Sequence, residues 1–243
     1  AVIKGAAERI LENRGLKEKG VNIKYLSQND NSKTINSIYK NRDPRENIRK
    51  GYNAGFLSND LKGKNLLTGE KVVLEKKNTI LMPEKELSGA VLHEIGHADN
   101  FNNSKILRML QKARLTGLIM PPLLLLYVSL TKESRPKNEN SNLSVGGKTN
   151  NFIRDNAVAL SLIASTTIVA EEAIATIKGH RFSKNLIPKS VRNKALKGNL
   201  LGLATYVITA LSSSLGVYIA VKQKNNAIKE KEEELKNRVI YIT

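Results

Sequence analysis

No cysteine occurs among the 243 residues of the chain. Without a thiol the protein forms no disulfide, and a structural zinc finger or any other thiolate metal site is excluded. Aromatic residues are scarce as well, at 5% with no tryptophan, which argues against a protein that stacks nucleic-acid bases on aromatic rings.

Acidic residues are few compared with basic ones. The chain has 22 Asp and Glu against 40 Lys and Arg, a formal net charge of +18. Such an excess attracts anions, either nucleic acid or the anionic face of a membrane. No nucleic-acid recognition motif accompanies the charge, and lysine-rich loops are mostly solvated surface, so nucleic acid is not the favoured partner.

The first segment, residues 1–114, is polar and predicts a soluble N-terminal part. Its first twenty residues carry too many charges for the apolar core of a secretory signal peptide. They predict instead an amphipathic helix that ends near Gly15. The apolar residues expected on one side of this helix are Ile3, Ala7, Ile10 and Leu11.

Strands are expected in the same segment. Residues 21–26 alternate between apolar and polar side chains, and residues 65–82 have the pattern strand, turn, strand, with Val72–Leu74 and Thr79–Leu81 extended. Residues 27–60 are rich in Asn, Asp and Ser, so only loops and short helices are expected there. The predicted fold class is α+β and mostly helical, with a small sheet.

Three later segments lack charge and predict two or three transmembrane helices: Leu115–Thr131, Asn156–Ala170 and Gly198–Val221. The first reaches about 26 Å as a helix, just short of a bilayer core of about 30 Å, and Pro121 and Pro122 should kink it. The third reaches about 36 Å, enough to span with tilt. The alternative is buried helices of a soluble bundle, which is strongest for the second segment.

Small residues recur at fourfold spacing in the third apolar segment, a pattern typical of closely packed membrane helices. They are Gly198, Gly202, Ser212, Gly216 and Ala220.

Polar stretches separate the apolar segments. A polar loop is expected at 131–152, around Gly146–Gly147, and a basic loop at 178–197. The predicted division of the chain is a soluble zincin-like part at 1–114, two hydrophobic helices at 115–177, the basic loop, a transmembrane helix at 198–221, and a charged, partly helical tail at 222–243.

Charge near the apolar segments predicts an orientation. If all three segments span, residues 1–110 and 173–197 lie on one side, where basic residues are densest. The positive-inside rule makes that side the cytosol. The basic residues are Lys105, Arg108, Lys112, Arg114, Lys178, Arg181, Lys184, Lys189, Arg192, Lys194 and Lys197.

The stretch LMPEKELSGAVLHEIGHADN, residues 81–100, carries two of the three histidines. His93 and His97 are four positions apart, so on a helix both imidazoles leave one face and can share an ion. Glu94 can take the proton of a water that zinc activates for attack on a carbonyl. The alternative is an ordinary helix with two surface histidines.

The helix that carries this motif is expected to begin at Pro83, with Glu84 and Glu86 in its first turn. Asp99 stands where an apolar residue would be expected. The uncharged residues that should bury the helix are Ala90, Val91, Ile95, Gly96 and Ala98.

A catalytic zinc site needs a third protein ligand beside an open position. The extended motif with a third histidine fails, because Asn100 and Asn103 occupy its last two fixed positions. Adjacent carboxylates at the end of an apolar helix are costly unless they have a role; the alternative is a solvated helix end at the headgroup level. The candidates are Glu171, Glu172, His180 and Asp155.

The motif HEIGH, followed by apolar segments and by EAIA at 172–175, resembles membrane-embedded gluzincin metallopeptidases, namely the HtpX-like heat-shock peptidases, the CAAX-processing proteases and the YugP-like peptidases. In that group the E-x-x-A helix supplies the third zinc ligand. The resemblance implies one Zn²⁺ per chain held by His93, His97 and Glu172, with Glu94 as general base. Glu171 does not fit, because position 174 is Ile.

The resemblance covers roughly residues 79–178, and the chain departs from it in two places. Thr176 stands where the HtpX-like group usually has an Asp that orients a ligand histidine. The number and order of the apolar segments also differ, because no hydrophobic hairpin precedes the soluble part and one span, at 198–221, follows the residues that the resemblance covers. His180, eight residues past Glu172, could polarise the oxyanion, as such peptidases often require. The alternative is a solvated histidine beside Arg181.

Together these features predict a zinc endopeptidase in a bacterial-type inner membrane, with its site facing the cytosol. The partners are the lipid bilayer and an extended polypeptide substrate, laid along the strand near Thr79–Leu81. The alternatives are a soluble or conditionally inserting zinc peptidase, as in a toxin or a phage-delivered protein, and a non-enzymatic basic membrane protein.

Overall fold

The computed structural model describes residues 2–27, 45–51, 54–64, 69–84, 89–131 and 145–240. It is mostly helical with a small sheet, as predicted. The chain forms two compact units: the first comprises Ala1–Gln111 and Ala170–Ala204, and the second Lys112–Val169 and Thr205–Thr243.

In the first unit the structure describes four short or medium helices. They are α1 (Val2–Asn13), α3 (Glu46–Arg49), α4 (Ala90–Asn103) and α5 (Lys105–Lys112). The end of α7 (Val145–Phe182) and the start of α8 (Lys189–Ile240) also belong to this unit.

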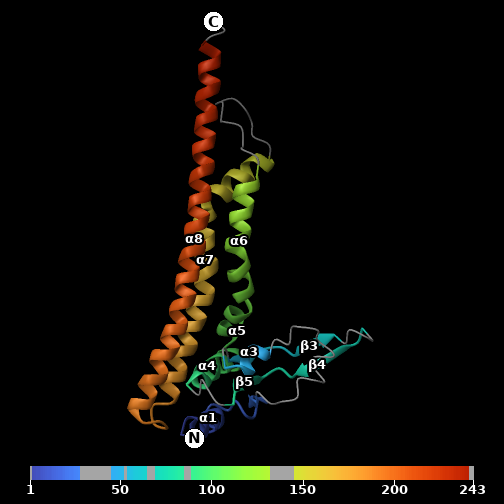
Figure 1. Cartoon of the computed structure of the whole chain (residues 1–243), viewed down its shortest axis with the longest axis vertical. Coiled ribbons are helices and arrows are strands. Elements are labelled where there is room, and N and C mark those ends of the chain that lie inside the picture. Colours follow the sequence, from blue (N-terminus) through green and yellow to red (C-terminus); the bar gives the residue numbers. More distant parts are fainter. Residues whose placement is uncertain are drawn as a thin grey trace. The chain divides into compact units, whose positions relative to one another are not determined.

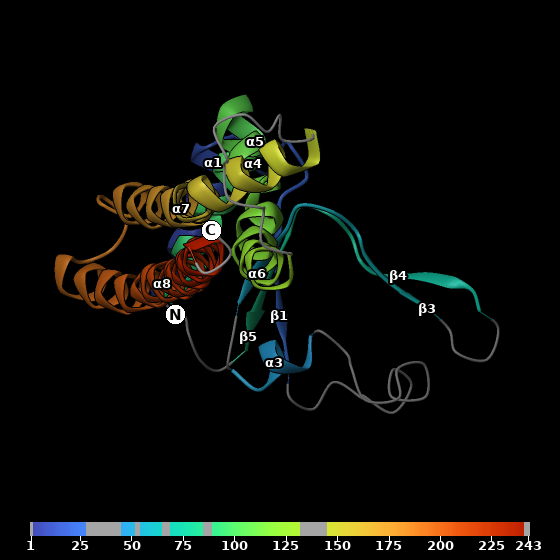
Figure 2. The same ribbon diagram turned by 90° about the horizontal axis from the view of Figure 1, so that it is seen from above.

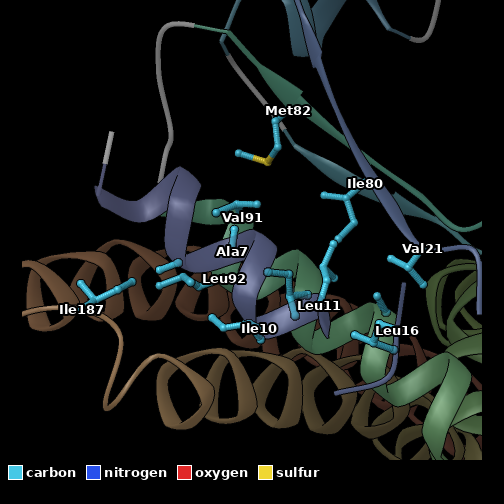
Figure 3. Close-up of a cluster of buried hydrophobic side chains, with 13 residues drawn as sticks. Ala7, Ile10, Leu11, Leu16, Val21, Ile80, Met82, Val91, Leu92 and Ile187 are labelled. Carbon is cyan, nitrogen blue, oxygen red and sulfur yellow. The ribbon is translucent and has the colours of Figure 1, made fainter. Parts of the chain in front are cut away.

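The amphipathic N-terminal helix is confirmed. Helix α1 buries Ala6, Ala7, Ile10 and Leu11, and the chain leaves it at Gly15, whose φ of 63° suits a residue without a Cβ. Figure 3 shows these side chains packed with residues of the sheet and of α4 in one core. The core residues labelled there are Ala7, Ile10, Leu11, Leu16, Val21, Ile80, Met82, Val91, Leu92 and Ile187.

Three strands form the sheet of this core, in the order β1-β5-β2. The central strand β5 (Thr79–Pro83) is buried along its whole length, pairs in parallel with β1 (Asn22–Leu26), and pairs antiparallel with β2 (Gly55–Leu57). The strands predicted at 21–26 and at Thr79–Leu81 are therefore confirmed.

Two further strands, β3 (Leu61–Lys64) and β4 (Lys71–Glu75), form a separate antiparallel hairpin. The hairpin extends away from the three-stranded sheet (Figures 1 and 2). Strand β4 covers the predicted Val72–Leu74, and a turn joins it to β5. Much of the predicted polar stretch 27–60 lies outside the described residues.

The expected helix start at Pro83 is wrong. Pro83 is the last residue of β5, opposite Leu26 of β1, and α4 begins only at Ala90. Burial of the whole strand outweighs the local preference of proline for a first helical turn. Glu86 lies outside the described residues.

The second unit contains α6 (Arg114–Leu130), the first part of α7 and the last part of α8. Within it, α7 and α8 run alongside each other (Figure 1). Helix α6 continues through Pro121 and Pro122. The buried core residues are Leu124, Val128, Ala157, Val217 and Ala220.

Both predicted loops are shorter than expected. Helix α7 begins at Val145, so Gly146–Gly147 is helical. Only the six residues 183–188 separate α7 from α8, and the rest of the predicted loop 178–197 is helical. Lysine and arginine are good helix formers, so a basic stretch is no evidence against a helix.

The glycines of the fourfold pattern in α8 do not form its packing face, although Ala220 of the same pattern is buried. A Cβ added at Gly198, Gly202 or Gly216 would meet nothing within 4 Å. Instead Ser214 is buried, and its hydroxyl lies 2.9 Å from that of Ser161 on α7. The contact face is therefore offset from the glycines.

Among the described residues, three helices are long and apolar enough to cross a membrane. They cover Lys105–Leu130, Val145–Phe182 and Lys189–Glu234, and so include the three predicted segments except Thr131 at the end of the first.

Candidate metal centre

Two helices of the first unit carry the candidate site. Helix α4 provides His93, Glu94 and His97, and the last part of α7 provides Glu171 and Glu172. These five residues form two overlapping groups whose ligand atoms lie within 4.8 Å of one another. The predicted His/Glu cluster is therefore assembled by helices that are more than sixty residues apart in the sequence.

The two helices cross antiparallel at very short range. A Cβ at Gly96 would lie 2.1 Å from the carbonyl oxygen of Ala175, and one at Gly179 would lie 2.1 Å from that of Leu92. No side chain fits at either point, so glycine at both positions lets the backbones touch. This contact brings the α4 histidines to the α7 glutamates.

Three side-chain atoms converge between the helices. The Nε2 atoms of His93 and His97 are 2.9 Å apart. Glu172 Oε2 lies 3.0 Å from the first of these nitrogens and 3.5 Å from the second. Ligands at about 2.0–2.1 Å from a tetrahedral zinc would be about 3.3 Å apart, so this triangle fits such an ion.

The two outer ring nitrogens are held by other side chains. His97 Nδ1 lies 2.8 Å from Glu171 Oε1, which also accepts a hydrogen bond of 3.0 Å from Asn100. His93 Nδ1 lies 2.9 Å from the hydroxyl of Thr176. Because both Nδ1 atoms are engaged, both Nε2 atoms face the same point.

Glu94 lies beside this triangle. Its carboxylate belongs to the metal-capable group with His93 and His97, and the residue is buried. The side chain is close enough to exchange a proton with a water near the three ligand atoms.

The site is rich in buried negative charge. Glu171 and Glu172 are almost completely buried, and Glu94 is buried as well. Burial alone would lower the pKa of His97, but hydrogen bonds to Glu171 and Glu172 outweigh it and raise that pKa to about 10. The surroundings of this ring therefore favour positive charge, in the form of a proton or a metal ion.

The structure explains why Asp99 is not apolar. Its carboxylate is buried and accepts hydrogen bonds from Arg14 at 3.0 Å, Lys178 at 2.7 Å and Asn103 at 2.7 Å. Burial would raise the pKa of Asp99, but these donors, Lys178 first, hold it below its ordinary value. The residue links α4 to Arg14, which directly follows α1, and to Lys178 of α7, next to the histidines.

Two predicted candidates are not brought into the cluster. His180 belongs to neither metal-capable group found among the described residues, and eight helical residues place it about 12 Å along α7 from Glu172. Asp155 belongs to the second unit and pairs with its neighbour Arg154.

The sequence prediction did not assign the residues that hold the histidines. The pairing of Glu171 with His97, and the part of Asn100 in it, depend on the register of the helix crossing. For Thr176 the sequence held a signal, because the resemblance places at this position a residue that orients a ligand histidine.

Comparison of the chain with models of known protein families, with curated proteins and with solved structures found no match. The geometry by itself establishes a buried His/Glu group that could bind a metal ion.

Proposed function

We propose that the protein is a zinc-dependent endopeptidase anchored in a membrane. The observation that carries this proposal is the triangle of His93 Nε2, His97 Nε2 and Glu172 Oε2, with sides of 2.9, 3.0 and 3.5 Å. Two imidazoles and one carboxylate are a ligand set of catalytic zinc, which keeps a fourth position open. Sites for calcium or magnesium use oxygen ligands throughout.

The residues present fit the steps of peptide hydrolysis. Zinc, when bound, would polarise the scissile carbonyl and make a water acidic enough to attack it. Glu94 takes the proton of the attacking water and passes it to the leaving amine. Glu171 and Thr176 keep the two imidazoles oriented during these steps.

The expected docking of the substrate along Thr79–Leu81 needs correction. Over Thr79–Leu81, strand β5 is paired with β1 on one side and with β2 on the other, so neither edge is open to a peptide there. Among the described strands the sheet ends at β1 and β2, and β2 contacts α4 through the rings of Phe56 and Phe101, 5.9 Å apart. In this proposal an extended substrate pairs with the outer edge of β2.

Membrane anchoring is supported by the exposed side chains of the candidate spans. Leu115, Leu123 and Leu126 of α6 are each more than half exposed, as are Leu201 and Ile208 of α8. Apolar surface of this extent is costly in water and natural in lipid. The positive-inside rule places the site at the cytosolic face of a bacterial-type inner membrane.

Metal content of the detergent-purified chain tests the ligand assignment. We expect one zinc per chain, lost in Glu172→Gln. The matched variant Glu171→Gln removes only the carboxylate behind His97, so zinc should be retained with an affinity lower by about 10–100-fold. Equal loss in both variants would contradict the assignment of Glu172.

Peptide cleavage then tests the chemistry. Glu94→Gln should keep zinc and lose activity, because the amide cannot accept the proton of the water. If the natural chain binds no zinc even after incubation with the ion, the peptidase proposal fails and a non-enzymatic basic membrane protein remains. Extraction by buffer without detergent would contradict the membrane anchor alone.

A further inference from the structure

Helix α5 (Lys105–Lys112) has an apolar face that the described residues cover only in part: Leu107 and Leu110 are half-buried, whereas Ile106 and Met109 are exposed. None of its eight residues is buried. Ile106 is 78% exposed and Met109 64% exposed. An isolated helix of this length is not stable in water, so its apolar face needs a partner.

The two faces of α5 are sharply divided. At 100° per residue, the apolar side chains occupy one half of the helix and the polar ones the other. The apolar residues are Ile106, Leu107, Met109 and Leu110, and the polar ones are Lys105, Arg108, Gln111 and Lys112. Cations beside an exposed apolar face are typical of helices that lie in the interface of an anionic membrane.

The sequence on either side of α5 also indicates a lipid surface. No acidic residue occurs between Asp99 and Glu133, so the positive charge of α5 is uncompensated in the sequence. Only Ala113 separates α5 from α6, the uncharged helix that begins a candidate span. Although Lys105–Leu130 as a whole is long enough to cross a membrane, the cations of α5 suit the headgroup layer better than the hydrocarbon.

Local contacts hold α5 against α4, the helix that carries His93 and His97. Ser104 is extended and breaks the path of the chain between α4 and α5, and its hydroxyl accepts a hydrogen bond from the backbone N–H of Leu107 at 3.2 Å. Arg108 donates to the carbonyl oxygens of Phe101 and Asn102 at the end of α4, and its guanidinium lies over the Phe101 ring. Lys105 and Lys112 remain exposed at the ends of the helix.

We propose that α5 lies flat in the headgroup layer of an anionic phospholipid bilayer, with Ile106 and Met109 in the upper hydrocarbon and Lys105 and Lys112 at the phosphates. The proposal rests on the membrane insertion proposed above and not on the peptidase chemistry. Because Arg108 ties α5 to α4, the lipid surface then lies close to the His/Glu cluster. Polypeptide segments next to the membrane become the accessible class of substrate.

Site-directed labelling tests this placement, and the absence of native cysteine makes every label unique. Single variants Ile106→Cys, Met109→Cys, Lys105→Cys and Lys112→Cys are spin-labelled and reconstituted in vesicles of phosphatidylglycerol and phosphatidylcholine. We expect labels at 106 and 109 to collide more often with oxygen, which partitions into lipid, than with a water-soluble nickel complex. Labels at 105 and 112 should show the reverse.

Two controls separate the possible failures. Leu123→Cys, on the exposed side of α6, reports insertion of the span itself. Lys105→Glu with Lys112→Glu should reduce the oxygen preference at position 106, because both phosphate contacts are lost.

A label at 106 that meets the nickel complex as freely as one at 105, with Leu123 in lipid, overturns the proposal and leaves the membrane anchor intact. Labels at 106 and 109 that meet neither reagent would show a protein partner and would overturn it as well. An aqueous signal at Leu123 would overturn the membrane anchor and the placement of α5 together.

Discussion

The two units each contain a close helix crossing, and the polar groups that the two units bury differ. In the first unit, Gly96 lets α4 touch α7; in the second, Gly117 brings α6 so close to α7 that a Cβ would lie 2.6 Å from the carbonyl oxygen of Ala164. The first crossing buries carboxylates and a histidine. The buried polar residues described in the second unit are serines: Ser161, Ser165 and Ser214.

This difference distinguishes a helix contact that only packs two helices from one that also holds a functional site. In the second unit a glycine lets α6 approach α7, and a hydroxyl pair joins α7 to α8, both at little electrostatic cost. Burying Glu171 and Glu172 is expensive unless a positive charge accompanies them. Burial lowers the pKa of His97, but hydrogen bonds to Glu171 and Glu172 outweigh it and raise that pKa to about 10, so a proton on the ring or a metal ion beside it is favoured. The polar crossing therefore marks the candidate site.

Of the variants that test this comparison, Gly96→Ala should lose the most stability and the most bound zinc. In Gly96→Ala the Cβ would lie 2.1 Å from the carbonyl oxygen of Ala175, so the two helices must separate. We expect a loss of about 3 kcal/mol in the free energy of unfolding, together with loss of bound zinc. Thermal unfolding in detergent and metal analysis of the same preparation measure both.

Two further alanine variants make this result specific. Gly117→Ala should also destabilise the protein, but it should leave zinc bound because the crossing it disturbs lies in the second unit. Gly216→Ala places its Cβ in open space, so stability should be unchanged or rise by up to about 1 kcal/mol, since alanine favours helix. Equal behaviour of all three variants would refute the role assigned to the Gly96 contact.

Asp99→Asn should reduce the free energy of unfolding by an intermediate amount. The variant keeps the shape of the side chain and loses its charge beside Arg14 and Lys178. Breaking a fully buried pair costs about 3–5 kcal/mol, and the partial exposure of both partners reduces our expectation to about 2 kcal/mol. Chemical denaturation at pH 7 measures the difference.

The effect of Asp99 should depend on pH in a defined direction. Its pKa in the folded chain lies below the ordinary value of 3.8, so in acid the unfolded chain takes up a proton before the folded one does. The stabilisation is present above that ordinary value and disappears as the pH falls through the folded pKa. The gap between the natural chain and Asp99→Asn should therefore narrow below about pH 4. A constant gap from pH 7 to pH 3 would rule out an electrostatic origin.

Local patterns predicted what depends on local spacing. The four-residue interval of His93 and His97 places both rings on one helix face, and the apolar period of residues 3–11 identifies the buried side of α1. The alternation at 21–26 likewise identifies β1. Each of these features is set by helix or strand geometry within a few residues.

The remaining features depend on contacts between distant segments. Pro83 favours a helix start by itself, but pairing with β1 makes it the end of a strand. The pairing of Glu171 with His97 follows from the register in which Gly96 meets Ala175 and Gly179 meets Leu92. These residues are separated by about eighty positions, so no local period contains the information.

The hydroxyl pair of the second unit should give the smallest effect. Ser161 and Ser214 are both buried with their Oγ atoms 2.9 Å apart, one on α7 and one on α8. Hydrogen bonds between membrane helices are worth about 0.6 kcal/mol on average in double-mutant cycles, because the separated helices find other partners. We expect Ser161→Ala and Ser214→Ala to show a coupling of that size, with zinc content unchanged in both single variants and in the double variant. A coupling of several kcal/mol, or loss of zinc, would mean that this contact of α7 with α8 also supports the metal centre, and the contrast between the two units would fail.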